Sequence, residues 1–167
     1  MTAPRLIDLA ALPLQPWKNG GGVTSELAID PPGATAETFR WRISLARIAQ
    51  DGPFSAFPGI TRWITLIEGG GFTLDFSDGS RLDVPEPFVP HRFDGGMAAT
   101  CRLKGGPSRD LNVMARADVA MDVQVVAAGA GAPPHEVPPP GFALIAGDIV
   151  LVRLDDSRML RAAVLAG

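Results

Sequence analysis

The sequence predicts an all-β fold, a sandwich or barrel of many short antiparallel strands. Three observations predict it. The 167 residues include 19 glycines and 16 prolines, well above the usual combined share of about 12%, and this excess favours tight turns over long helices. Several segments alternate apolar and polar residues with the period of two that is typical of a half-buried strand. One such segment, 66–78, has a weak repeat at 144–156.

The strand signal recurs along the whole chain. It is found at 23–29, 39–48, 61–68, 72–76, 80–84, 111–115, 121–127 and 142–154, the last being broken at Gly147-Asp148. Segment 39–48 puts Trp41 and Ile43 on one face of its strand and Arg42 and Ser44 on the other. Between 72–76 and 80–84, Asp78-Gly79 predicts a two-residue hairpin turn, because both residue types tolerate positive φ.

The repeat predicts two related β modules within a single unit that spans residues 1–167. At an offset of 78 residues, Leu66 and Gly69 match Leu144 and Gly147, and the apolar positions that follow also match. We therefore expect equivalent hairpins at 66–82 and 144–159. The alternative is that any two strands joined by a glycine turn look alike.

Two related halves of short antiparallel strands are typical of the jelly roll, the architecture of the cupins. Residues 129–141, rich in proline and glycine, are expected to form a loop and not a linker between domains, because the last strands still need a sheet to join.

Composition excludes several classes of function. The chain carries 15 Lys+Arg against 18 Asp+Glu, a formal net charge of −3, which provides no electrostatic footprint for nucleic acid. The N-terminal residues do not resemble a signal peptide, because Asp8 and Pro13 interrupt the apolar run, and no stretch is long and apolar enough to span a membrane. We expect a cytoplasmic protein without nucleic-acid or membrane partners.

Histidine and cysteine are too few for a metal centre of the usual kind. Cys101 is the one cysteine, so an intramolecular disulfide is excluded. His91 follows Pro90 in a stretch that resembles the second cupin motif, but the hairpin before it, 66–76, contains no histidine. His135 lies in the proline-rich loop, where we expect it to be solvated. We expect no metal and no cofactor.

The segment 16–22, Pro-Trp-Lys-Asn-Gly-Gly-Gly, is a candidate ligand loop. Asn19 before three glycines favours a turn, and glycines let the backbone approach a ligand closely. Successive amides beside Lys18 could form an anion-binding nest. The alternative is a glycine bulge at the entrance of a strand.

The strand at 23–29 places Thr24, Glu26 and Ala28 on one face. If this strand neighbours 39–48, Glu26 meets an arginine such as Arg42. Two interpretations stay open. The pair is either a surface ion pair worth about 0–1 kcal/mol, or part of a polar cavity floor in which arginine holds a carboxylate.

Two further segments present polar groups beside apolar ones. In the loop 51–62, Phe54 and Phe57 are expected to pack underneath, while Ser55 and Arg62 are presented at a rim. In the strand at 110–114, one face carries an acid, an amide and a thioether, from Asp110, Asn112 and Met114. Asn112 can both donate and accept, which suits either a ligand or a structural role.

Three blocks of this sequence resemble the HutD/Ves family: PWKNGGGVTSELA at 16–28, RISLARIAQDGPFSAFPGITR at 42–62, and GGPSRDLNVMAR at 105–116. The resemblance implies a metal-free bicupin, two cupin-like jelly-roll barrels in one chain. It also implies a link to bacterial histidine utilisation for one branch and a stress-related role for the other. The family pattern points to a ligand-binding set that comprises Trp17, Lys18, Asn19, Thr24, Glu26, Arg42, Ser55, Phe57, Arg62, Asp110, Asn112 and Met114. After about residue 117 the chain departs from the family pattern.

Three functions fit these residues. The first is a protein that binds a small acidic metabolite such as urocanate or N-formylglutamate, to sense or buffer it. The second is a cofactor-independent enzyme on such a molecule, with Glu26 as the candidate catalytic base. The third is a stress-related interaction protein that uses the 16–22 loop. A homodimer paired through an edge strand is compatible with all three.

Overall fold

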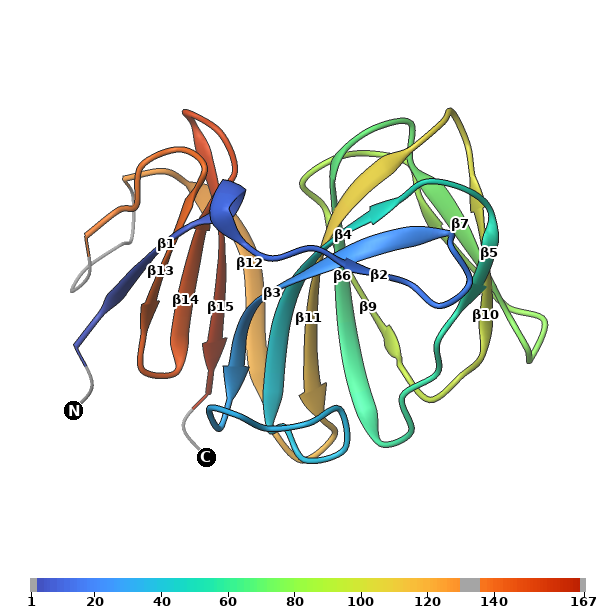
Figure 1. Ribbon diagram of the computed structural model, residues 1–167, viewed down its shortest axis with the longest axis horizontal. Coiled ribbons are helices and arrows are strands. Elements are labelled where there is room, and N and C mark those ends of the chain that lie inside the picture. Colours follow the sequence, from blue (N-terminus) through green and yellow to red (C-terminus); the bar gives the residue numbers. More distant parts are fainter. Residues whose placement is uncertain (1–2, 130–135, 166–167) are drawn as a thin grey trace. The chain divides into compact units, whose positions relative to one another are not determined.

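The computed structural model describes residues 3–129 and 136–165 (Figure 1). Its elements are β-strands, apart from one 3-10 turn at Leu9–Ala11 within the described residues, so the predicted all-β class is confirmed. Among these residues no helix is long and apolar enough to cross a membrane. The chain divides into a larger unit, Pro13–Asp118, and a smaller unit formed by residues up to Leu12 and from Val119 onward.

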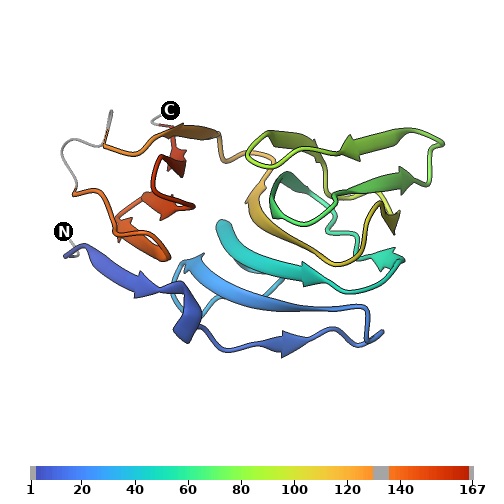
Figure 2. The ribbon, with the colours of Figure 1, turned by 90° about the horizontal axis from the view of Figure 1, so that it is seen from above.

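The larger unit contains two antiparallel sheets. The six-stranded sheet has the order β2 (Gln15–Pro16), β3 (Gly22–Asp30), β4 (Trp41–Ile48), β11 (Ser108–Arg116), β6 (Ile60–Glu68) and β9 (Pro90–Asp94). The four-stranded sheet has the order β5 (Gly52–Phe54), β10 (Ala99–Leu103), β7 (Phe72–Phe76) and β8 (Arg81–Val84). In Figure 2, β3 and β4 (blue and cyan) lie on the opposite side of this unit from β7 and β8 (green).

Apolar side chains from both sheets fill one part of the interior of the larger unit. Ile64 and Leu66 of β6 belong to the same buried cluster as Phe72 and Leu74 of β7, and each is completely shielded from solvent. Burying a side chain of this size contributes about 1.5–3 kcal/mol. This cluster holds the two sheets together and leaves the rest of the interior free for polar groups.

The predicted hairpin at Asp78-Gly79 is confirmed. Strands β7 and β8 pair antiparallel, with Leu74 opposite Leu82. The Asp78 carboxylate accepts a hydrogen bond from the backbone N–H of Ser80 at 2.9 Å. Gly79 has φ +88°. Glycine adopts this backbone conformation without steric strain, whereas a residue with a Cβ would be strained.

A β-bulge in β3 corrects one face assignment. Glu26 lies opposite Ser44, but the register then skips Leu27, and Ala28 lies opposite Ile43. Because one extra residue reverses the alternation that follows it, Ala28 lies on the opposite face from Glu26. The prediction that both share a face with Thr24 was wrong for Ala28.

The smaller unit is one antiparallel sheet in its described residues, in the order β1 (Arg5–Asp8), β13 (Phe142–Ala146), β14 (Ile149–Arg153), β15 (Arg158–Val164) and β12 (Met121–Ala127). Val152 and Leu160 are opposite each other and completely buried. The N-terminal strand β1 was not predicted, because its four residues show no regular alternation between apolar and polar types.

The two repeated segments agree in their second strand pair and differ in their first. Strands β7 and β8 form a hairpin, as β14 and β15 do. However, β13 pairs with β14 across Gly147-Asp148, whereas β6 and β7 belong to different sheets. The three-glycine connection at 69–71 makes this change of sheet feasible, because a Cβ on Gly70 would lie 2.8 Å from the Gly105 Cα. Such a close approach of two backbones needs glycine.

Candidate functional site

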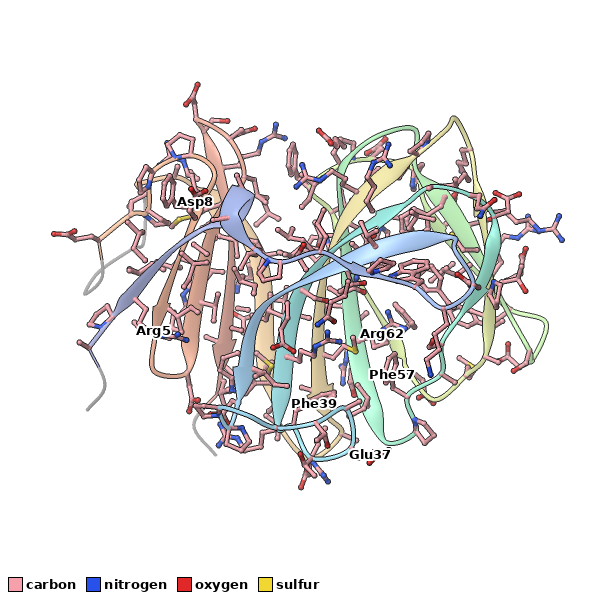
Figure 3. All side chains as sticks on the ribbon, in the orientation of Figure 1. Arg5, Asp8, Glu37, Phe39, Phe57 and Arg62 are labelled. Carbon is pink, nitrogen blue, oxygen red and sulfur yellow. The ribbon has the colours of Figure 1, made fainter. Side chains whose placement is uncertain are left out.

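The larger unit contains a cavity of about 600 Å³. It is lined by residues of β2, β3, β4, β5, β6 and β11 and of the segments 17–19 and 55–57. Figure 3 labels two of the lining residues, Phe57 and Arg62. The lining consists of Gln15, Pro16, Trp17, Lys18, Asn19, Thr24, Arg42, Ser44, Ala46, Pro53, Phe54, Ser55, Phe57, Arg62, Asn112 and Met114. The structure therefore brings together all the residues of the predicted ligand-binding set except Glu26 and Asp110, which do not line the cavity.

Strand register explains why these side chains share the interior. Arg42 of β4 lies opposite Met114 of β11, and Met114 lies opposite Arg62 of β6. Ser44 lies in the same way opposite Asn112. Directly opposed residues in a sheet project to the same face, so the polar face of β4 is the one that lines the cavity.

Arg62 lies in the floor of this cavity. Arg62 is only 5% exposed to solvent. Nη2 donates to the Asn112 Oδ1 at 3.0 Å and Nη1 donates to the Ser55 carbonyl at 3.3 Å, while Nε has no partner among the described residues. The prediction that Arg62 sits at a rim was wrong, because its position opposite Met114 turns the side chain inward.

Aromatic rings surround the Arg62 guanidinium. Its central carbon lies 5.7, 5.4 and 5.2 Å from the ring centroids of Phe54, Phe57 and Phe93. Such contacts stabilise a cation by about 0.5–2 kcal/mol each. Phe54 and Phe57, which were expected only to pack beneath the 51–62 loop, therefore also contact the Arg62 guanidinium and hold it in place. Phe93 was missed because its strand, β9, was not predicted.

Asn112 joins Arg62 to a second buried group, Asp110. The Asn112 Nδ2 donates to the Asp110 Oδ2 at 2.7 Å, and the other carboxyl oxygen has no partner in the described part of the chain. Asp110 is 0% exposed. Burial raises the pKa of Asp110 to about 7, against smaller opposing effects of Arg62 and the Asn112 hydrogen bond.

The cavity lining is cationic. Lys18, Arg42 and Arg62 line it, and no carboxylate is present among the described residues that do. Burial lowers the pKa of Arg62 to about 10, so the guanidinium still carries its charge at neutral pH. Arg42 donates from Nε to the Glu26 Oε1 at 2.9 Å. This contact confirms the predicted pairing of Glu26 with an arginine, although the Glu26 side chain is 41% exposed.

The 16–22 loop is organised by its own hydrogen bonds. The Gly20 N–H donates to the Trp17 carbonyl at 3.0 Å, and the Gly21 N–H donates to the Asn19 Oδ1 at 2.8 Å. These two amides are therefore bonded within the loop, and they do not form the anion-binding nest predicted for this segment. Trp17 donates from its indole nitrogen to the Thr24 hydroxyl at 2.7 Å. Lys18 is exposed and lines the cavity.

Gly22 closes this loop, and we expect Gly22→Ala to destabilise the protein. An added Cβ would lie 2.5 Å from the Arg47 carbonyl oxygen and 3.1 Å from the Trp17 ring. Overpacking of this kind costs about 1–3 kcal/mol, measurable by urea unfolding. Gly52→Ala is the matched control, because its Cβ would meet only the Asn19 Nδ2, at 3.8 Å. Equal losses in both variants would contradict the steric explanation.

No metal centre is evident in the part of the chain that the structure describes, because no three His, Cys, Asp or Glu side chains are grouped there. His91 lies on β9 opposite Ile64, with its Nε2 buried and unpartnered among these residues. Cys101 is buried, and burial raises the pKa of its thiol to about 12. His135 lies outside the described residues.

Comparison with known proteins gives one family match and several relatives. The family model described as HutD matches residues 9–155. An uncharacterized 21.2 kDa protein in the hutC 3′ region of Pseudomonas putida is 39% identical over 114 residues, covering 68% of this chain and 59% of that protein. Protein Ves of Citrobacter koseri is 41% identical over 114 residues, covering 66% and 57%. The matched region thus spans less than two thirds of the length of these relatives.

Solved structures match over a larger share of the chain. HutD from Pseudomonas fluorescens SBW25 has a TM-score of 0.78 at 26% identity, covering 99% of this chain and 100% of that one. A conserved protein of unknown function from Pseudomonas aeruginosa PAO1 has a TM-score of 0.74 at 25% identity, covering 98% and 93%. The cupin domain of Schizosaccharomyces pombe Cnp3 matches at a TM-score of 0.50 and 10% identity, over 65% and 71%. The expected bicupin fold is confirmed.

Proposed function

Since this chain belongs to the HutD family, we propose that it is a binding protein for a small carboxylate, which it takes into the cavity of the larger unit. The observation that carries this proposal is the buried Arg62, whose Nε lacks a partner in the described residues, in a lining with two more cations and no carboxylate. A buried cation that has no carboxylate hydrogen-bonded to it is costly. An anionic ligand would compensate it.

Size and energetics support a metabolite-sized ligand. The cavity volume of about 600 Å³ lies within the range of small-molecule sites, about 300–1,000 Å³. A charge-assisted hydrogen bond contributes about 1.5–3 kcal/mol net. Three such bonds, from Arg62, Arg42 and Lys18, contribute about 4.5–9 kcal/mol. This range includes the value of about 8 kcal/mol that corresponds to micromolar affinity, before the entropy cost of association is counted.

The relatives indicate which carboxylates to test. One relative is a protein of the hutC 3′ region, and the family carries the name HutD. Acidic intermediates of histidine breakdown, such as urocanate or N-formylglutamate, fit a cationic cavity. The biological role that we propose is to sense or buffer one of these acids, as part of the regulation of histidine utilisation.

The geometry favours binding over turnover. Glu26, the candidate base, does not line the cavity, and its Oε1 accepts from Arg42. A general base must lie within hydrogen-bond reach of the proton that it removes. We therefore assign Glu26 the task of orienting Arg42.

A thermal-shift panel tests the proposed function. The purified protein is heated with histidine, urocanate, N-formylglutamate, glutamate or formate. A ligand at a hundred times its Kd adds about 2.7 kcal/mol of stability, which raises Tm by about 5–11 °C for a chain of this size. We expect a selective shift for one acid. If no acid shifts Tm, the carboxylate proposal is wrong and a protein partner at the 16–22 loop becomes the better explanation.

Variants of the ion pair separate binding from catalysis. Arg42→Ala is expected to weaken binding of the acid found in the panel by more than about tenfold, since it removes one charge-assisted hydrogen bond. Glu26→Gln retains a hydrogen-bond acceptor for Arg42 and is expected to change affinity by less than about threefold. Isothermal titration calorimetry measures both. Loss of a turnover activity in Glu26→Gln at unchanged affinity would instead establish an enzyme.

A further inference from the structure

We infer that anion binding in this cavity is coupled to the uptake of one proton by Asp110, so that the protein binds its carboxylate more tightly as pH falls. Asp110 does not line the cavity, and it acts through Asn112 and Arg62. This inference rests on the proposed function, because it describes how the charge of the same site is regulated.

The geometry places Asp110 directly behind the cavity floor. Asn112 bridges the two charged groups, accepting from Arg62 at 3.0 Å and donating to Asp110 at 2.7 Å. Each end of this chain of hydrogen bonds has one atom without a partner among the described residues, Arg62 Nε and Asp110 Oδ1. The carboxyl group can take up a proton at a free oxygen, and the guanidinium keeps a free donor.

Among the described residues, Asp110 is the carboxylate whose charge acts on Arg62, and it raises the pKa of the guanidinium. When Asp110 is ionised, it offsets the positive potential that Arg62 offers to a ligand. When Asp110 is protonated, that potential is fully available to an anion. With burial raising the pKa of Asp110 to about 7, both forms are populated near neutral pH.

Thermodynamic linkage makes the effect reciprocal. An anion beside Arg62 removes the favourable effect of that cation on the ionised carboxylate and adds repulsion, so it raises the pKa of Asp110 further. By linkage, protonation of Asp110 must strengthen anion binding by the same factor. If the pKa rises by about one unit, affinity at pH 6 exceeds that at pH 8 by about fivefold.

Other charged or titratable groups face this interior from each neighbouring strand. Arg62 comes from β6 and Arg42 from β4, and both are cations near neutral pH. Cys101 comes from β10, and burial, Asp110 and Asp51 keep its thiol protonated by raising its pKa to about 12. His91 comes from β9, opposite Ile64. His91 is a second titratable side chain on these strands, so a His91 variant is the control for any pH effect.

Carbon-13 NMR titration of the Asp110 carboxyl carbon tests the inference directly, with acetate as the probe anion at constant ionic strength. We expect a midpoint well above the ordinary range of aspartate in the free protein, and a higher midpoint with acetate. An ordinary midpoint in the free protein, or no rise with bound acetate, overturns the inference and leaves the proposed function standing. If acetate perturbs no resonance of the cavity residues, both are overturned.

Calorimetry with variants gives a second, independent readout. Acetate or urocanate is titrated at pH 7 in two cationic or zwitterionic buffers of different ionisation enthalpy, and the difference in heat reports proton uptake. We expect uptake in the wild type and in His91→Asn, and none in Asp110→Asn, whose affinity should not vary between pH 6 and 8. Loss of uptake in His91→Asn with retention in Asp110→Asn would assign the proton to His91 and overturn the inference. If Asp110→Asn does not fold, the NMR titration and His91→Asn still decide.

Discussion

Arg62→Met is expected to weaken carboxylate binding by at least about a hundredfold while the protein remains folded. The wild-type guanidinium is buried, with Nε free of partners in the described residues, and two charge-assisted hydrogen bonds to a carboxylate are worth about 3–6 kcal/mol. Methionine fills a similar volume without charge, and replacing a buried charge by an apolar group is often neutral for stability. In this variant the Asn112 Oδ1 no longer receives the hydrogen bond from Arg62, so the free energy of unfolding should fall by no more than about 3 kcal/mol.

Two controls make this result specific to the cavity. Arg109→Met removes an arginine of the same strand pair that is paired with Glu68 and whose side chain is 41% exposed, and it should leave affinity unchanged. Arg62→Lys keeps a charge but lacks the planar fork of donors, so an intermediate affinity is expected. Calorimetry with the acid found in the thermal-shift panel measures all three variants. Wild-type affinity in a folded Arg62→Met protein would show that the ligand does not contact the cavity floor.

The free energy of unfolding is expected to decrease by about 3 kcal/mol between pH 5 and pH 8. Burial raises the pKa of Asp110 from its ordinary value to about 7 in the folded protein. The folded state therefore holds the proton more tightly than the unfolded state, and stability is lost as pH rises from about 4 to about 7. Each pH unit in this interval costs about 1.4 kcal/mol.

Asp110→Asn isolates this contribution. The asparagine resembles the protonated acid in shape and charge, so the variant should match the wild type near pH 5 and exceed its stability at pH 8. Urea unfolding at a series of pH values measures the free energy of unfolding of both proteins. In the difference between them, the contributions of all other titrating groups cancel. Parallel stability curves for the two proteins would show that Asp110 titrates in the ordinary range.

Local pattern was sufficient for most of the strands. Strands β7 and β12 have the predicted ends, because alternation of side chains and the turn types between them are properties of a few neighbouring residues. Pairing of Glu26 with Arg42 followed from two adjacent strands with polar faces. Strands β9 and β10 were missed, because five-residue segments that include charged residues, and in β9 also a proline, carry little signal.

The chemistry of the cavity was beyond such patterns. Arg42 and Ile43 occupy opposite faces of β4, and alternation is the same whichever face is turned inward. Which face of β4 is turned inward depends on where the four-stranded sheet packs. The strands of that sheet are paired through contacts between residues that are distant in sequence. The burial of Arg62, and the pKa of Asp110 that follows from burial, are consequences of that closure.

By itself, the sequence determined the all-β class, the hairpin at Asp78-Gly79, the family resemblance and most of the residues that line the cavity. The tertiary structure alone decided that Arg62 forms the floor and not the rim and that the bulge at Leu27 places Ala28 on the opposite face. It also decided that the Gly20 and Gly21 amides bond within their own loop. The physical reason is one of range. Turns and alternation are local, whereas burial, desolvation and the charge of an interior depend on residues brought together from distant parts of the chain.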